Sequence, residues 1–151
     1  MLFGTWLEHY YFERYVLDVS IATLESGGVT SRLDTYQFLG PIDAWGVPKY
    51  PKETAILAPG ANIADELVQF IQANETYLRE PDAWLGTWIC PMTRRCHLDI
   101  TIICSCLEDA EQEAAMRSRQ QESKILAVYN FKHRQTVYLA SETVLSSPAP
   151  V

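Results

Sequence analysis

Two stretches of the amino-acid sequence resemble each other, residues 4 to 24 and residues 86 to 107. Both contain Gly-Thr-Trp, then Leu-Asp-aliphatic-Ser/Thr-Ile further along, and finally a Leu-Glu pair. A repeated pattern of this length indicates a repeated supersecondary unit. The sequence therefore predicts an internal duplication, which restricts the folds open to the chain.

The second arm of each copy alternates apolar and polar side chains with the two-residue period of a half-buried strand. This alternation runs from Leu17 to Ile21 in the first copy and from Cys96 to Cys104 in the second. In the second copy, Pro91 stands where a tight turn favours proline. We therefore predict a β-hairpin for each copy.

Two helices and another pair of strands are predicted elsewhere. Residues 63 to 79 carry apolar side chains at helical spacing after Asn62, which is a favourable N-cap residue. Residues 107 to 121 begin with acidic side chains, as helix starts commonly do. Residues 124 to 131 and 134 to 139 have the composition of paired strands.

These elements predict an α+β fold with a mostly antiparallel sheet, two similar β-hairpins and two helices. The length of 151 residues fits one domain. We expect a single domain over residues 1 to 145 that contains the repeat at 4 to 24 and 86 to 107. The Ser- and Pro-rich residues 146 to 151 are expected to form a flexible tail.

Composition and charge narrow the function classes. The net charge of −7 opposes the attraction to phosphates that drives nucleic-acid binding. No run of residues is long and apolar enough for a membrane helix, and no basic segment precedes Glu8 as in a secretory signal. Phosphate-binding glycine motifs are missing from the sequence. We expect a cytoplasmic protein with no cofactor, no direct nucleic-acid partner and no membrane association.

Four cysteines lie close together in the sequence, at Cys90, Cys96, Cys104 and Cys106. Their spacing differs from the Cys-x2–4-Cys knuckles of structural zinc sites. We expect them to act as small apolar residues in a reducing compartment. A metal-binding or redox module that uses these four residues is the alternative.

His97 and Asp99 are predicted to lie two residues apart on one face of a strand. A carboxylate can orient an imidazole for general-base catalysis, so a small hydrolase is an alternative function. No nucleophile motif accompanies the pair, and the first copy has Val16 at the position of His97. We favour a structural role for the repeated Asp18 and Asp99.

Aromatic side chains are concentrated in residues 9 to 15. Tyr10, Tyr11 and Phe12 cannot all face inward on one strand or turn, so some of them are expected to be exposed near a hairpin tip. Exposed aromatic side chains often anchor a protein partner. We predict these three residues as a binding surface, with burial under residues 33 to 50 as the alternative.

The second half of the chain resembles a small module found in uncharacterised proteins of bacteria and their phages. The resemblance covers residues 84 to 139 and rests on Gly86-x-Trp88, Leu98-Asp99-Ile100-Thr101, an Ala-rich helix and Ile125-Leu126-Ala127-Val128-Tyr129-Asn130. Arg94 departs from it, because a glycine is typical of that turn, and so do the cysteines. The resemblance implies an accessory protein of a bacterium or mobile element and carries no activity.

The leading hypothesis is a non-enzymatic accessory factor that binds another protein through its acidic surface and exposed aromatic side chains. The hydrolase and the cysteine-based module are the alternatives. A duplicated hairpin with exposed sheet edges would also permit a symmetric homodimer.

Overall fold

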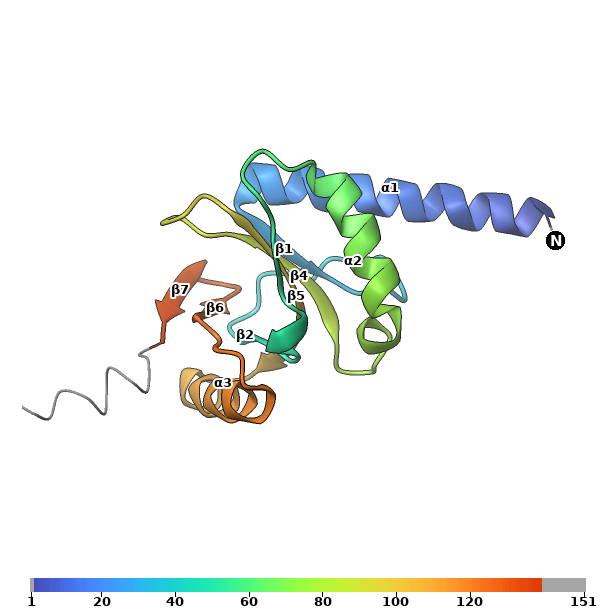
Figure 1. The fold of residues 1–151 in the computed structure, drawn as a ribbon. Coiled ribbons are helices and arrows are strands. Elements are labelled where there is room, and N and C mark those ends of the chain that lie inside the picture. Colours follow the sequence, from blue (N-terminus) through green and yellow to red (C-terminus); the bar gives the residue numbers. More distant parts are fainter. Residues whose placement is uncertain (1, 140–151) are drawn as a thin grey trace, which may run out of the picture. The chain divides into compact units, whose positions relative to one another are not determined.

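The computed structural model describes residues 2–139, and side chains from Trp6 onward. This part of the chain contains three α-helices and seven β-strands (Figure 1). In chain order the elements are α1 (Leu2–Ser26), β1 (Gly28–Ser31), β2 (Trp45–Pro48), the 3-10 helix η1 (Pro51–Glu53), β3 (Ala55–Ile56), α2 (Ile63–Leu78), β4 (Trp84–Ile89), β5 (Cys96–Cys104), α3 (Leu107–Gln121), β6 (Ala127–Asn130) and β7 (Gln135–Tyr138). The predicted α+β class with antiparallel pairing is confirmed.

The chain divides into two compact units. The first unit comprises Met1–Leu39 and Glu53–Thr101, and the second comprises Gly40–Lys52 and Ile102–Val151. Strand β5 therefore contributes its first six residues, from Cys96 to Thr101, to the first unit. A single domain over residues 1 to 145 stays a prediction, and the predicted tail at 146 to 151 lies outside the described residues.

The first unit packs helices α1 and α2 against an antiparallel sheet in the order β1–β4–β5, with β3 paired to β5. Two hydrogen bonds between hydroxyls connect α1 to this sheet: Tyr15 to Ser31 at 2.6 Å and Thr23 to Thr87 at 2.6 Å. The fully buried apolar side chains of this unit come from both layers: Val19, Leu67, Leu78, Leu85, Leu98 and Ile100.

Residues 4 to 24 form part of helix α1, so the predicted first hairpin is wrong. The buried side chains of this segment recur at helical spacing: Tyr15, Val16, Val19, Ser20 and Thr23. The alternation from Leu17 to Ile21 suggested a strand because apolar residues also lie between the buried ones. The helix ends at Gly27, which has a φ of 85° and donates its N–H to the carbonyl of Thr23.

The other predicted elements agree with the structure. Strands β4 and β5 form the hairpin expected in the second copy, with Trp88 opposite His97 and Gly86 opposite Asp99. Asn62 caps α2, since its side chain accepts a hydrogen bond from the N–H of Asp65 at 3.0 Å. Helix α3 has the predicted bounds, and the Cys106 sulfur caps its first turn.

The second unit combines helix α3 with the antiparallel strands β2, β6 and β7. Its core is a single apolar cluster: Trp45, Val47, Ile102, Ala110, Ala114, Ile125 and Val128. Asn130 is fully buried and its side-chain amide donates to Asp43, while its carbonyl oxygen accepts from the N–H groups of Lys132 and His133. These bonds fix the turn between β6 and β7.

Within residues 2–139, the helices are too short or too polar to cross a bilayer.

Candidate functional site

Helix α1 has an exposed apolar face that we call the α1 stripe, formed by Trp6, Tyr10, Leu17, Ile21 and Leu24. Their side chains are between 44% and 67% exposed. At about 100° of rotation per residue, the five positions fall within a sector of about 60° that extends about 27 Å along the helix. The stripe is therefore a continuous surface on one side of one rigid element.

The stripe is exposed because α1 uses a different face to join the first unit. Tyr15, Val16, Val19 and Thr23 are buried and face the sheet and α2. This buried face lies on roughly the opposite side of the helix from the stripe. Helix α1 thus has two apolar faces, of which one is covered by its own unit.

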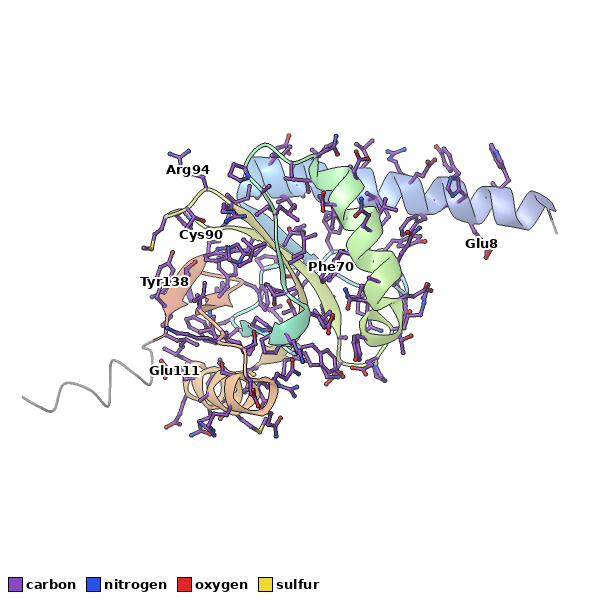
Figure 2. All side chains as sticks on the ribbon, viewed as in Figure 1. Glu8, Phe70, Cys90, Arg94, Glu111 and Tyr138 are labelled. Carbon is purple, nitrogen blue, oxygen red and sulfur yellow. The ribbon has the colours of Figure 1, made fainter. Side chains whose placement is uncertain are left out.

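The N-terminal half of α1 extends beyond α2 (Figure 1). Side chains project from several sides of this segment, Glu8 among them, and those from Glu8 to Tyr11 are exposed (Figure 2). The aromatic rings in this segment contact one another. The rings of Trp6 and Tyr10 stack with centroids 6.1 Å apart, and the ring of Tyr11 packs edge-on against that of Tyr10 with centroids 5.4 Å apart. Contacts between neighbouring rings order this end of the stripe before any partner binds.

The predicted binding residues lie in this segment, on a helix and not at a hairpin tip. Tyr10 belongs to the stripe, Tyr11 is exposed beside it, and Phe12 is half-buried on another side of the helix. The predicted binding surface did not include Trp6, Leu17, Ile21 or Leu24. Their spacing of three, four or seven residues was the available signal, but it was hidden by the apolar residues of the buried face.

Charged side chains border the stripe. Arg14 and Asp18 form an ion pair at 3.5 Å along one edge, and His9 approaches Glu13 at 3.4 Å along the other. All four side chains are about half exposed or more. Pairs at this spacing on a surface helix contribute little stability by themselves, and they remain available to a partner.

His97 and Asp99 lie on the same face of β5, as predicted, but they have different partners. The ring of His97 packs edge-on against Trp88 with centroids 5.1 Å apart, and only 7% of the residue is exposed. Burial lowers the pKa of His97, and the nearby Arg95 lowers it further. A buried imidazole held against an indole is poorly placed to abstract a proton from a substrate.

The Asp99 carboxylate binds Thr54, whose hydroxyl donates to it at 2.5 Å. Burial raises the pKa of Asp99 to about 6, and the hydrogen bond from Thr54 opposes that rise. This bond connects β5 to the residue that precedes β3, so it ties two parts of the first unit together. The arrangement supports the structural role predicted for Asp99.

The four cysteines are free thiols and are divided between the two units. Cys90 and Cys96 are buried in the first unit, while Cys104 and Cys106 belong to the second. Burial raises the pKa of Cys96 to about 11 and also raises that of Cys104, which makes both thiols weak nucleophiles. Among residues 2–139 no three His, Cys, Asp or Glu side chains are placed to share a metal ion.

Comparison with known proteins adds no functional information, because no protein-family model, curated protein or solved structure matches the chain.

Proposed function

We propose that the protein is a non-enzymatic accessory factor that binds another protein chain through the α1 stripe. The observation that supports this function is the stripe itself, five large apolar side chains that stay exposed on one face of a helix. Contiguous exposed apolar surface on a folded protein commonly marks an interaction site. A helix face of this kind fits a partner helix or groove through side chains spaced by three, four and seven residues.

The buried half of α1 supports the proposal. Hydroxyl pairs and apolar contacts fix Tyr15, Val19 and Thr23 in the first unit, so the helix is already formed before a partner arrives. Binding to a preformed helix avoids most of the entropy that ordering a peptide would cost. Trp6 and Tyr10 add large aromatic surfaces of the type that dominates protein interfaces.

A cytoplasmic location is part of the proposal. The described chain carries four free cysteines, and thiols persist in reducing compartments. The origin in a bacterium or phage rests on the sequence resemblance alone and stays a prediction.

The hydrolase alternative receives less support. A general base needs access to substrate, and His97 is buried against Trp88 while Asp99 binds Thr54. Protein binding therefore fits these side chains better than hydrolysis does.

Photochemical cross-linking in cells tests the proposal. Tyr11 lies beside the stripe without belonging to it, so replacing it with p-benzoylphenylalanine places a reactive group next to any docked chain. The same replacement at Met92, an exposed apolar residue on the β4–β5 turn, is the matched control. We expect a covalent protein adduct from position 11 that is lost when Leu17→Glu is added, and no such adduct from position 92.

Adducts of equal yield at both positions, or an adduct at position 11 that Leu17→Glu leaves unchanged, would contradict the assignment of the stripe. The complete lack of adducts at position 11 would contradict the function itself.

A further inference from the structure

The α1 stripe has two chemically different ends. Trp6 and Tyr10 make its N-terminal end aromatic, whereas Leu17, Ile21 and Leu24 make its C-terminal end aliphatic. Consider a two-fold axis that runs between two copies of α1, perpendicular to both helices and level with the peptide bond between Tyr15 and Val16. Rotation about this axis places the aromatic end of one helix beside the aliphatic end of the other. A second copy placed by this rotation would lie antiparallel, with its Ile21 opposite Tyr10 and its Leu24 within one residue of the level of Trp6.

This arrangement matches large side chains with small ones. Each aromatic ring of one copy faces an aliphatic side chain of the other, so the distance between the two helices stays even along the stripe. A parallel arrangement would place Trp6 against Trp6 and Tyr10 against Tyr10 at one end, and would force the helices apart there. Close packing at even spacing is what stabilises helix pairs.

The charges at one edge of the stripe are also complementary. A two-fold axis across antiparallel helices brings each edge of the stripe against the same edge of the second copy. Arg14 of each copy then approaches Asp18 of the other, on both sides of the axis. These residues are exposed and already form a pair within one helix, so each can extend its ion pair across the interface.

Within the first unit, the N-terminal half of α1 extends beyond α2, so α2 leaves this half of the helix uncovered (Figure 1). Antiparallel pairing places that half along the C-terminal half of the second copy, on the side that faces away from its sheet (Figure 1). The two helix dipoles also oppose each other in this orientation, which is favourable.

The sheet of the first unit offers a poorer route to a dimer than the sequence suggested. The C-terminal half of the outer edge of β1 is already covered, because Leu39 donates its N–H to the carbonyl of Thr30 and Ser31 forms a bridge with Phe38. An edge that is covered in this way does not recruit another strand.

The α1 stripe is a small interface. Five half-exposed side chains, each able to bury roughly 150 to 250 Å² when aromatic and less when aliphatic, give on the order of 500 Å² per helix. Such an area lies at the lower end of specific interfaces, so we expect weak association and test it around micromolar concentrations.

We propose that the occupant of the α1 stripe is the α1 stripe of a second copy of this chain, in an antiparallel and symmetric homodimer. This inference rests on the proposed function, since it names the protein that binds the stripe.

Sedimentation equilibrium over a hundredfold range of concentration around the micromolar range tests the inference. We expect the weight-average mass to rise from 17.2 kDa toward twice that value in the wild type. Leu17→Glu places two carboxylates near the two-fold axis and is expected to keep the protein monomeric. Leu126→Glu, which changes an exposed leucine of the second unit, is the matched control and is expected to dimerise normally.

Disulfide trapping tests the orientation. In a Cys106→Ser background, Tyr10→Cys and Ile21→Cys variants are oxidised separately and then as a mixture. We expect a cross-linked dimer only in the mixture, because position 10 of one copy faces position 21 of the other. A dimer from Tyr10→Cys alone would indicate parallel helices and overturn the antiparallel arrangement.

The outcomes separate this inference from the function on which it rests. A wild type that stays monomeric at every concentration overturns the homodimer, and a cross-link from position 11 to a different protein would then leave the proposed function in place. A Leu17→Glu variant that still dimerises overturns the stripe as the dimer surface. Circular dichroism of that variant confirms that α1 is intact, since Leu17 is exposed and its replacement removes no core contact.

Discussion

Residues 4 to 24 and residues 86 to 107 share a sequence pattern, but one copy lies in helix α1 and the other forms the β4–β5 hairpin before entering α3. The two copies differ in the segment that joins Gly-Thr-Trp to the Leu-Asp pair. No glycine or proline lies between Trp6 and Leu17, whereas Pro91 and the positive φ of Arg94 form a turn in the second copy. The comparison shows that the turn, more than the alternation itself, decides whether such a pattern becomes a hairpin.

Equivalent residues of the two copies therefore have different surroundings. Leu17 is half exposed on the α1 stripe, while Leu98 is fully buried beneath the helices of the first unit. Asp18 forms an exposed ion pair with Arg14, while Asp99 is held by the hydroxyl of Thr54. Four experiments test this divergence.

Truncation of the equivalent leucines should produce the largest contrast. Leu98→Ala removes a fully buried side chain and leaves a cavity, so we expect the free energy of unfolding to fall by about 2 to 5 kcal/mol. Leu17→Ala at low protein concentration should cost about 0.5 kcal/mol or less. Urea denaturation followed by circular dichroism measures both, and equal losses would mean that residue 17 is buried.

The pH dependence of Asp99 is expected to have the next largest effect. Its pKa in the folded protein, about 6, lies above the ordinary value of 3.8, so the folded state binds the proton more tightly than the unfolded state. The contribution of Asp99 to stability should therefore be greatest below about pH 4 and fall by about 2 to 3 kcal/mol as the pH rises to about 6. Asp99→Asn keeps an acceptor for Thr54 and should remove this part of the pH profile.

Unfolding free energies of wild type and Asp99→Asn at matched pH values between 4 and 7 provide the measurement. A difference between the two proteins that does not change over this range would show that Asp99 keeps an ordinary pKa.

Arg94→Gly should strengthen the turn that distinguishes the second copy. Arg94 has a φ of 64°, which glycine adopts without the steric cost that a side chain incurs. We expect a gain of about 1 kcal/mol in thermal unfolding experiments. Arg95→Gly, at the neighbouring position without a positive φ, should give no gain and is the control.

Asp18→Asn should have the smallest effect on the isolated chain. Exposed ion pairs at this helical spacing typically contribute less than about 1 kcal/mol. The same substitution should weaken the proposed homodimer, because it removes the group that Arg14 of the second copy approaches. A change in the dimer dissociation constant without a change in unfolding at low concentration would separate the two roles.

Much of the fold could be predicted from local sequence signals. Asn62, Pro81 and the apolar spacing between them define α2, and Pro91 with the following alternation defines β4 and β5. Helix α1 could not be assigned in this way, because apolar residues on both of its faces produce a two-residue alternation as well as a helical period. The choice between them depends on contacts with β1, β4 and α2, which lie far away in the sequence.

The candidate site was predictable only in part. Aromatic clustering predicted that some of Tyr10, Tyr11 and Phe12 are exposed. Trp6 and Leu24 join them only once the segment is known to be helical. The hydrogen bond between Thr54 and Asp99 joins residues 45 positions apart, and no local pattern indicates it.

A helix with two apolar faces also limits how its sequence can diverge. The sheet and α2 constrain one side of α1, and a bound chain would constrain the stripe on the other, so only narrow strips around Glu13 and Glu25 remain open to change. Most helices on a protein surface have a whole solvent-facing side on which substitutions are nearly neutral. Saturation mutagenesis of α1 should therefore find few tolerant positions, and those positions should form two thin lines along the helix.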